Sequence, residues 1–413
     1  MKMLMLTQYF PPEVGAPQNR LFENAVRWKK MGLEIDVLTA MPNYPKMEIH
    51  QDYEGKWFSK EKIDELTVYR AWIFVSKSKS IVFRLMNYFS FVFSSMLVAL
   101  FKLKKYDVVF VESPPLFLGI SARFICRIKG AKMIFNVSDL WPESAEKLGL
   151  VTNKTFLKMA TVLEEHLYKK SAIITGQTQG IVKDIQSRFP NKKVYWLPNG
   201  VNLNLYDPEK KYGNWKEENG FKESDVLFVY AGIIGHAQGL EVILKAANEL
   251  KSQTNAHFIL VGSGPEKEIL LKMKSEMNLS NVHFYDAVSK AEMPAIIESC
   301  VMTIVPLKKL DLFKGAIPSK IFENLSMKVP VILGVDGEAR DLFVEDGKCA
   351  LHFEPENEVA LSKVITNVLE NKVDLVSMKE NARKYVGEKF NRDKIANEFF
   401  DYLLKKIHEK DLV

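Results

Sequence analysis

The chain has 413 residues, of which 47% are hydrophobic and 26% are charged, a composition that excludes an intrinsically disordered protein. Its length is sufficient for two domains with separate cores. The formal net charge is +6, but residues 1–200 carry 29 basic and 18 acidic side chains, whereas residues 201–413 carry 28 and 33. The basic excess therefore belongs to the first half, where we expect an anionic partner.

Cys126, Cys300 and Cys349 lie far apart in the sequence and lack the spacing of a metal or redox site. Their apolar surroundings predict buried thiols in a reducing compartment. The first residues, MKMLMLTQYFPPE, have no apolar core followed by a small-residue cleavage site, so we interpret them as a first strand.

The next residues follow the pattern of a parallel α/β unit. An apolar strand at 3–7 leads into a Pro-rich loop, an amphipathic helix at 21–31 and a second strand at 34–39. The loop contains one glycine, Gly15, and is therefore not a dinucleotide fingerprint. A turn at 39–45 and a charged excursion at 46–66 precede a strand predicted at 67–75.

Residues 81–101, IVFRLMNYFSFVFSSMLVALF, contain one charged residue, Arg84, and are long enough to cross a bilayer. Polar residues dilute the run, and a strand at 107–112 follows at once. We therefore favour a helix of the first domain whose outer face lies against a membrane interface. A buried crossover helix and a true span are the alternatives. The outer face is expected to include Leu85, Phe89 and Val92.

Basic residues surround this segment. Residues 77–132 hold ten of them, against Asp107 and Glu112 as the acidic ones. The lysines beside the apolar run are Lys77, Lys79, Lys102, Lys104 and Lys105. Nucleic acid and anionic lipid are the candidate partners of such a surface, and the neighbouring apolar run favours lipid.

The sequence NVSDLWPES follows a strand at 133–137. Because the carboxyl ends of parallel strands border the crevice of an open α/β sheet, Asp139, Trp141 and Glu143 are expected to face a ligand. The carboxylates would orient hydroxyl groups or accept a proton, and the indole would stack on a sugar. The alternative is a helix-capping aspartate followed by Trp-Pro packing.

A turn at 198–202 and the polar, turn-rich sequence YDPEKKYGNWKEENG predict a domain boundary near residues 200–222, with domains at 1–203 and 204–392. In the second domain, a strand at 226–230 leads to Gly232, Gly235, His236 and Gln238, just before a helix. Backbone N–H groups at this place suit a diphosphate. A strand at 257–261 leads similarly to Gly262 and Gly264 in a GSGPE turn, which favours a nucleotide cleft in a doubly wound sheet.

Residues 315–333, GAIPSKIFENLSMKVPVIL, form the central segment of the chain. A turn containing Gly315 and Ser319 leads into a short helix with Lys320 and Glu323, followed by a buried strand at 329–333. A carboxylate accepts two hydrogen bonds from a ribose diol, and a lysine neutralises a phosphate. Ordinary solvated surface positions are the alternatives for Lys320 and Glu323.

The segment PSKIFENLSMKVPVI resembles the carboxylate-bearing segment of GT-B glycosyltransferases of the retaining family 4, and QYFPPEVGAPQNR and DLWPES resemble its WbuB-like subgroup. The resemblance implies an α/β fold with two Rossmann-like domains whose parallel sheets face across a cleft. It also implies a final helix, 393–413, that packs back on the first domain. The enzymes of this subgroup build O-antigen and capsule sugars.

The resemblance also implies roles for individual residues. Glu323 would bind the ribose as the second of two family glutamates, whereas the place of the first, near the donor sugar, falls on Gly315. Gly15 would allow the backbone to approach the donor, and Arg20 would meet its phosphate unless it is solvated beside a rigid turn. Asp139 stands where many members have a histidine. The remaining donor-binding candidates are Gly235, His236 and Gln238, where relatives have an arginine and a lysine, together with Gly262, Gly264, Ser319 and the charge-supplying Lys320.

There is no Asp-x-Asp pair, so no obligatory metal cofactor is expected. We predict transfer of a sugar, N-acetyl-fucosamine or another N-acetylhexosamine, from a UDP-sugar to a polyprenyl diphosphate-linked acceptor. The protein would lie peripherally on the cytoplasmic face of the membrane through about residues 77–132 and bind no nucleic acid. A UDP-sugar 2-epimerase of the same architecture and a non-catalytic nucleotide-binding protein are the alternatives.

Overall fold

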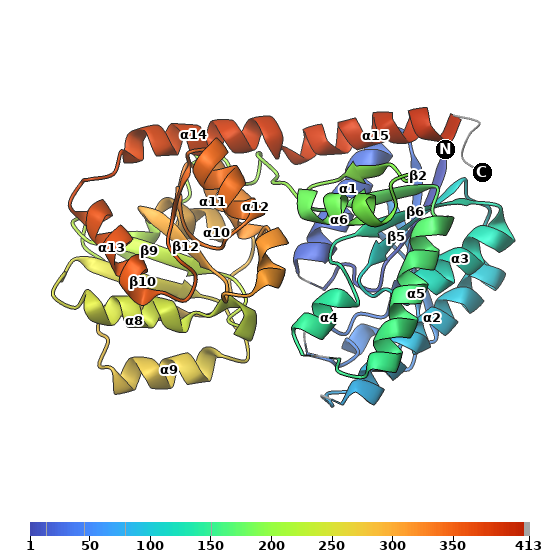
Figure 1. Cartoon of the computed structure of the whole chain (residues 1–413), viewed down its shortest axis with the longest axis horizontal. Helices are drawn as coiled ribbons and strands as arrows, with labels where there is room; N and C mark the ends of the chain where they lie inside the picture. Colours follow the sequence, from blue (N-terminus) through green and yellow to red (C-terminus); the bar gives the residue numbers. More distant parts are fainter. Residues whose placement is uncertain (14, 45, 79, 150, 409–413) are drawn as a thin grey trace. The chain divides into compact units, whose positions relative to one another are not determined.

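The computed structural model describes residues 1–13, 15–44, 46–78, 80–149 and 151–408, so the predicted membrane-facing Lys79 lies outside the described residues. The chain divides into two compact units, which we call unit 1 (Met1–Asn199 with Asp393–Val413) and unit 2 (Gly200–Arg392). Each unit is built on a mainly parallel sheet covered by helices (Figure 1). The predicted α/β fold with two Rossmann-like domains is therefore confirmed.

The sheet of unit 1 has the strand order β3-β4-β2-β1-β5-β6-β7-β8. All neighbouring strands pair in parallel except β3 and β4, which are antiparallel. The strand order reverses between β1 and β5, which makes their carboxyl ends the switch point where ligands bind in such sheets. The strands are β1 (Lys2–Leu6), β2 (Glu34–Ala40), β3 (Phe58–Ile63), β4 (Leu66–Ala71), β5 (Val108–Ser113), β6 (Lys132–Val137), β7 (Ile173–Gly176) and β8 (Val194–Trp196).

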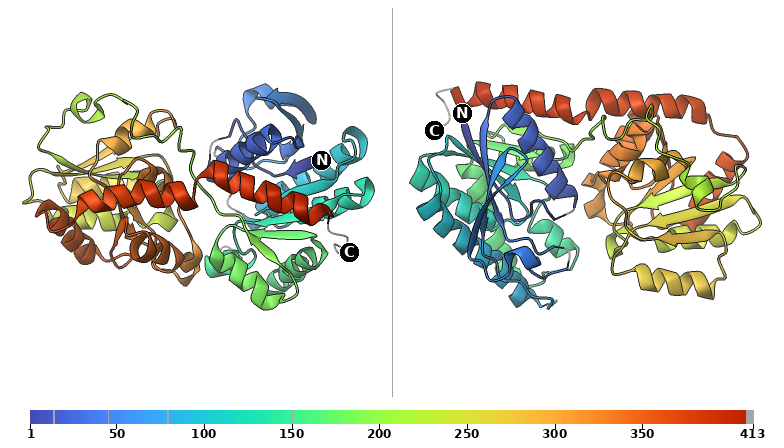
Figure 2. Two further views of the ribbon diagram at one scale, coloured as in Figure 1. Left: turned by 90° about the horizontal axis from the view of Figure 1, so that it is seen from above. Right: turned by 180° about the vertical axis from the view of Figure 1, so that it is seen from behind.

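Helices cover both faces of this sheet and enclose two hydrophobic cores. The helices are α1 (Ala16–Lys30), η1 (Gln51–Tyr53), α2 (Ile81–Lys102), α3 (Leu118–Lys129), α4 (Glu143–Lys147), α5 (Lys154–Lys170), α6 (Gln179–Arg188) and α15 (Arg392–His408). The C-terminal helix α15 packs on unit 1 beside α1 (Figure 2). The Trp28 ring lies 5.0 Å from that of Phe399, and its indole N–H donates to the carbonyl of Ala396 at 3.2 Å.

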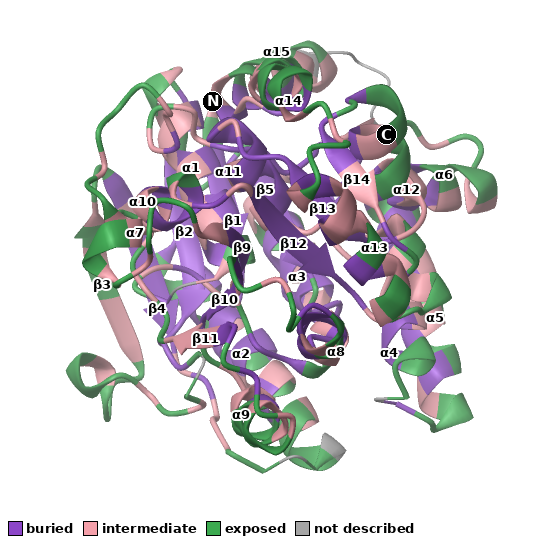
Figure 3. Cartoon of the chain, turned by 90° about the vertical axis from the view of Figure 1, so that its left-hand side faces the viewer, coloured by how far each residue is buried: buried purple, intermediate pink, exposed green. Residues whose placement is uncertain are grey.

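The sheet of unit 2 is parallel throughout and has the order β11-β10-β9-β12-β13-β14. Its switch point lies between β9 and β12, whose central segments are buried (Figure 3). The strands are β9 (Val226–Ala231), β10 (Ala256–Val261), β11 (Val282–Tyr285), β12 (Met302–Pro306), β13 (Val331–Gly334) and β14 (Ala350–His352). The helices are α7 (Trp215–Glu218), η2 (His236–Gln238), α8 (Glu241–Glu249), α9 (Lys267–Glu276), α10 (Met293–Glu298), η3 (Asp311–Gly315), α11 (Lys320–Ser326), α12 (Glu338–Arg340), η4 (Asp341–Asp346), α13 (Glu358–Leu369) and α14 (Leu375–Lys389).

Two parts of the chain differ from the sequence prediction. The charged excursion at 46–66 contains the edge strand β3, and the strand predicted at 67–75 ends at Ala71. The charged run in β3 is compatible with a strand because Glu61 pairs with the buried Arg70 of β4, with 2.5 Å between the two groups.

All three cysteines lie within the described ranges and are free and buried, as predicted. Burial raises the pKa of each thiol to about 12, which keeps the thiols protonated at neutral pH.

The polar residues of α2 dock the helix onto unit 1. The Asn87 side chain donates to the carbonyl of Phe74 at 2.6 Å and accepts from the Gln8 amide at 2.9 Å. The Ser90 hydroxyl accepts from the N–H of Phe74 at 2.8 Å, and the Ser94 hydroxyl donates to the carbonyl of Trp72 at 2.5 Å. These bonds would be lost if the helix left the domain to cross a bilayer.

The opposite face of α2 is apolar and exposed. Within the described residues, 82–102 form one helix that is long and apolar enough to cross a bilayer. In its apolar 18-residue stretch, 39% is buried. Val92 is buried, so its predicted place on the outer face is wrong, whereas Phe89 is exposed and Leu85 is partly exposed. The exposed stripe of α2 consists of Val82, Phe83, Met86, Phe89, Phe93, Leu97, Leu100 and Phe101.

Candidate functional site

The loops after β9 and β12 meet at the switch point of unit 2. The Lys308 ammonium lies 3.0 and 3.1 Å from the two ring nitrogens of the exposed His236, and the backbone N–H of Lys308 donates to the carbonyl of Ala237 at 3.0 Å. Lys308 was not predicted from the sequence, although its place directly after an apolar strand was a usable signal. Lys308 therefore adds a cation to the loop in which His236 and Gln238 were the predicted donors.

Lys320 is the first residue of α11, and its side chain folds inward against β9. Its ammonium lies 3.8 Å from the ring centroid of Tyr230, a cation–π contact. Gly232 has a φ of +140°, which favours glycine, and a Cβ atom there would lie 2.6 Å from the Lys320 ammonium, so a side chain at this position would also displace the lysine. Lys320 is therefore not an ordinary solvated lysine.

The surroundings of Lys320 also change its pKa. Burial lowers the pKa of the ammonium to about 7, while the nearby Glu323 carboxylate acts in the opposite direction. Near neutral pH, a substantial fraction of Lys320 is then uncharged until an anion binds beside it.

Glu323 lies one helical turn after Lys320 and is partly buried. Burial raises the pKa of its carboxyl group, and Lys290, Arg392 and a hydrogen bond from Tyr206 act in the opposite direction. The carboxylate thus lies within a cluster of cations and a hydroxyl group of unit 2. In the turn before it, an added Cβ at Gly315 would meet no neighbour among the described residues, and Ser319 makes no side-chain capping bond with them.

Gly262 and Gly264 allow two backbone loops to approach each other. A Cβ atom at Gly262 would lie 1.9 Å from the carbonyl oxygen of Gly232, and one at Gly264 would lie 2.2 Å from that of Ile234. The N–H of Ile234 donates to the carbonyl of Ser263 at 2.9 Å. These glycines have a packing role, whatever they contribute to a ligand.

The other predicted residues of this edge belong to one turn. Gly235 precedes η2, and its carbonyl accepts from the N–H of Gln238 at 3.2 Å. His236 and Gln238 lie in the same turn, which begins three residues after Gly232. Unit 2 therefore brings the η2 turn, the glycine loop and Lys320 to one edge of its sheet.

In unit 1, Arg20 forms part of a buried polar network. Its Nη2 atom lies 2.6 Å from the Glu112 carboxylate and 2.8 Å from the Ser138 hydroxyl. Asn136 donates to the same carboxylate at 2.6 Å. Arg20 is 3% exposed, so the alternative of a solvated side chain is wrong, while its contact with the donor phosphate stays a prediction. Its Nη1 atom is buried and has no hydrogen-bond partner within the described residues.

The predicted carboxylates after β6 lie in different surroundings. Asp139 accepts from the Ser144 hydroxyl at 2.7 Å, and burial raises its pKa while hydrogen bonds from Ser144 and the Leu140 backbone oppose the shift. Glu143 is partly exposed and lies 2.5 Å from the Lys147 ammonium. Asp139 therefore lies in the more buried and hydrogen-bonded surroundings, whereas Glu143 takes part in an ion pair within α4.

Trp141 and Gly15 complete the predicted residues of unit 1. The Trp141 ring makes edge contacts with Phe117, at 5.2 Å between centroids, and with Phe156, at 6.2 Å. Its predicted role on a sugar face thus competes with aromatic packing. Gly15 precedes α1 with extended backbone, and a Cβ atom there would lie 2.4 Å from the Gln18 side-chain oxygen.

Among the described residues, no group of three or more histidine, cysteine, aspartate or glutamate side chains is arranged to hold a metal ion. The groups at the two sheet edges are instead lysines, carboxylates, hydroxyls and backbone N–H groups. Such groups suit hydroxyl-rich and anionic ligands.

Two family models match consecutive parts of this chain. The model for glycosyltransferase family 4 covers residues 18–205, and the model for glycosyl transferases group 1 covers residues 212–385. Together they span most of both units. The chain therefore belongs to the GT-B glycosyltransferases of family 4.

Individual relatives agree with this assignment. The chain is 24% identical to the Escherichia coli K12 protein WcaI, named as a glycosyl transferase of colanic acid biosynthesis, over 97% of this chain and 99% of the relative. Sucrose-phosphate synthase from Thermosynechococcus elongatus has a similar structure, with a TM-score of 0.75 and 14% identity over 98% of this chain and 99% of that one. The structure of Anabaena HepE in complex with UDP and glucose has a TM-score of 0.70 and 16% identity, over 98% of this chain and 99% of that one.

Proposed function

We propose that this glycosyltransferase moves a sugar from a UDP-linked donor to a lipid-linked acceptor during synthesis of a bacterial surface polysaccharide. The name of WcaI, which refers to colanic acid, supports the polysaccharide, and the UDP-glucose complex of HepE supports the donor class. The WbuB-like sequence segments favour N-acetyl-fucosamine or another N-acetylhexosamine as the sugar, transferred with retention of anomeric configuration.

The observation that carries this proposal is the position of Lys320 at the sheet edge of unit 2. A partly buried ammonium beside a glycine loop favours a diphosphate, because the bound anion restores the charge that burial disfavours. Charge that develops on the leaving diphosphate would be stabilised by Lys320 and by neighbouring donors, including Lys308. Glu323 would accept hydrogen bonds from the ribose hydroxyls. No obligatory metal enters this proposal.

The exposed stripe of α2 supports a peripheral membrane position on the cytoplasmic face. Arg84 is exposed on α2, and Lys105 is exposed just after the helix ends, so cationic groups accompany the apolar stripe. In a monotopic membrane contact, apolar side chains enter the interface and neighbouring cations bind lipid phosphates. The exposed side chains of α2 and its cations have this combination.

The decisive test measures UDP release from a panel of UDP-sugars, with and without a membrane lipid extract from a polysaccharide-producing bacterium. Release that requires one donor together with the lipid supports the proposal and names the donor. Sugar interconversion without loss of UDP would instead identify an epimerase. UDP binding without turnover of any donor would identify a binding protein.

The ribose assignment predicts that Glu323→Ala weakens UDP binding about 10- to 100-fold, because two hydrogen bonds to a charged acceptor are lost. Isothermal titration with UDP measures the change. Glu268→Ala, which removes an exposed carboxylate from the first turn of α9, is the matched control and should bind UDP normally. Equal UDP affinity for the two variants would refute the assignment.

The membrane contact predicts that Phe89→Ser, Phe93→Ser and Leu97→Ser together lower partitioning onto anionic vesicles about a hundredfold, because apolar area no longer enters the interface. Vesicle sedimentation measures the bound fraction. A triple variant with Ile269→Ser, Val359→Ser and Val376→Ser removes comparably exposed apolar side chains from unit 2 and should bind normally. Normal vesicle binding by the α2 variant would leave α2 without a membrane role.

A further inference from the structure

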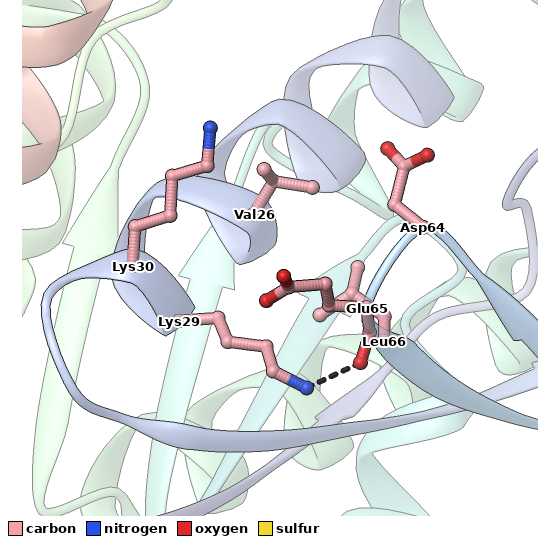
Figure 4. Close-up of a pocket in the computed structure, with 6 residues that line it drawn as sticks. All are labelled: Val26, Lys29, Lys30, Asp64, Glu65 and Leu66. Atoms are coloured by element: carbon pink, nitrogen blue, oxygen red, sulfur yellow. Dashed lines mark hydrogen bonds between the residues drawn. The ribbon is translucent and has the colours of Figure 1, made fainter.

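The carboxylates of Glu65 and Glu323 lie in contrasting surroundings. Glu65 lines a recess of about 160 Å³ near the end of α1 and the β3–β4 turn, where the Lys29 ammonium donates to its backbone carbonyl (Figure 4). Glu65 is exposed, so water solvates its carboxylate and leaves it free to turn. Glu323 is partly buried, and neighbouring side chains therefore decide how its carboxylate is oriented.

A tyrosine hydroxyl reaches Glu323 from the segment that begins unit 2, residues 200–207. The hydroxyl of Tyr206 donates a hydrogen bond to the Glu323 carboxylate. Tyr206 is 2% exposed, so its ring is packed inside the unit. An ionised carboxylate has about four acceptor positions, so one bond from a tyrosine leaves room for two ribose hydroxyls.

The backbone of Tyr206 is fixed to α11, the helix that carries Glu323. The hydroxyl of Ser326, which follows Glu323 on this helix, donates to the Tyr206 carbonyl at 2.7 Å. The Arg383 guanidinium of α14 donates to the same carbonyl at 2.7 Å and to the Ser326 carbonyl at 2.9 Å. Tyr206 is therefore held against α11 by its main chain, and its side chain reaches back to Glu323.

Further hydrogen bonds order the segment before Tyr206. The N–H groups of Leu205 and Tyr206 both donate to the carbonyl of Asn202 at 3.1 Å, which closes a turn. The Arg383 guanidinium also donates to the carbonyl of Leu203 at 3.4 Å. Because the main chain is already fixed, little conformational entropy is lost when the Tyr206 hydroxyl bonds to Glu323.

Cations also surround the Glu323 carboxylate. Burial raises the pKa of its carboxyl group, and Lys290, Arg392 and Lys320 are the charged groups that oppose this shift. Their attraction favours the ionised form but depends mainly on distance, whereas a hydrogen bond also depends on angle. The Tyr206 hydroxyl is therefore suited to fix the direction in which the carboxylate oxygens point.

We propose that Tyr206 is a positioning residue for donor recognition, which orients the Glu323 carboxylate toward the ribose hydroxyls of the UDP-sugar. Its hydroxyl acts through Glu323 and does not itself bind the donor. The inference rests on the proposed function for the role of Glu323 on the ribose. The contacts of Ser326 and Arg383 with the Tyr206 backbone support the place of the hydroxyl.

The test measures how strongly the full-length protein distinguishes UDP from 2′-deoxy-UDP, which lacks one ribose hydroxyl. Tyr206→Phe removes the tyrosine hydroxyl but keeps the ring, and should reduce the preference for UDP about three- to tenfold in isothermal titrations. Tyr212→Phe is the matched control, because the Tyr212 hydroxyl donates to the backbone carbonyl of Asp207 at 2.9 Å. The control should keep the full preference. An undiminished preference in Tyr206→Phe would overturn the proposal.

The pH dependence of UDP binding provides a second readout. Affinity should fall as the pH falls through the pKa of Glu323, because an ionised carboxylate is the stronger acceptor. Burial raises this pKa and the Tyr206 hydroxyl opposes the shift, so the fall should begin at higher pH in Tyr206→Phe. Titration of the UDP phosphates is common to all variants, and Tyr212→Phe should follow the unaltered protein. Identical profiles for all three proteins would contradict a hydroxyl that acts through Glu323.

Glu323→Ala separates this proposal from the ribose assignment on which it rests. If Glu323→Ala keeps the full preference for UDP over 2′-deoxy-UDP, the ribose assignment itself fails, and the positioning role fails with it. If Glu323→Ala loses the preference and Tyr206→Phe keeps it, the ribose assignment stands and only the positioning role is overturned. These titrations need no turnover, so they give the same answer whether or not any UDP-sugar is consumed.

Discussion

Replacing Lys320 with alanine is expected to lower kcat about 100- to 1000-fold, the usual cost of removing one preorganised electrostatic group from a transition state. UDP affinity should fall much less, because charge on the departing diphosphate is greatest during transfer. Steady-state kinetics together with UDP titration separates the two effects. Lys308→Ala, at the neighbouring loop, should have the smaller effect because the contact of this lysine with His236 is exposed to solvent.

The same lysine predicts a pH dependence. Its pKa in the free protein is about 7, so the charged form is lost as the pH rises through that value. We therefore expect kcat/KM to fall above about pH 7. A bound anionic donor raises the pKa of Lys320, so the fall in kcat should occur at higher pH. A Lys320→Ala variant that kept both the rate and this pH profile would contradict the assignment.

Arg20→Ala is expected to destabilise unit 1 by about 3–5 kcal/mol, the usual cost of leaving a buried charge without its partner. Among the described residues, the Glu112 carboxylate would then keep Asn136 and Ser138 as donors. Chemical denaturation followed by tryptophan fluorescence measures the loss. Arg127→Ala, at an exposed position on α3, is the control and should change stability by less than about 0.5 kcal/mol.

This variant also distinguishes the two roles considered for Arg20. A purely structural residue should lose stability without a specific loss of UDP affinity at temperatures where the variant is folded. A loss of UDP affinity in the folded variant would show that the Nη1 atom reaches the donor. A fully stable variant would contradict the buried ion pair.

Much of the fold was predictable because parallel strands buried on both faces appear as short apolar runs separated by amphipathic helices. The edge strand β3 was missed because it has no such apolar run: Lys60, Glu61 and Lys62 interrupt the pattern. Their suitability for a strand depends on Arg70, a partner supplied by tertiary pairing. Local sequence does not contain that information.

The site was predictable only in part. Glu323 and Lys320 are close in sequence and share one helix start, so the segment could be recognised as a unit. Lys308 and His236 are distant in sequence and meet only because β9 and β12 are neighbours in the sheet. Arg20 shows the opposite limit. It lies on α1 and was predicted to meet the donor phosphate, but Glu112 of β5 holds it in a buried ion pair.

The position of α15 has a consequence for how the protein is made. Phe399 and Leu403 fill the same core as Trp28 and Phe110, although well over half of the chain separates them in sequence. During synthesis, unit 1 leaves the ribosome first but lacks this side of its core until the last helix emerges. Unit 2 has no such dependence, because residues 200–392 contain all of its described strands. Unit 2, which is synthesised later, can therefore complete its fold before unit 1. Part of the core of unit 1 stays exposed to solvent until α15 has been synthesised.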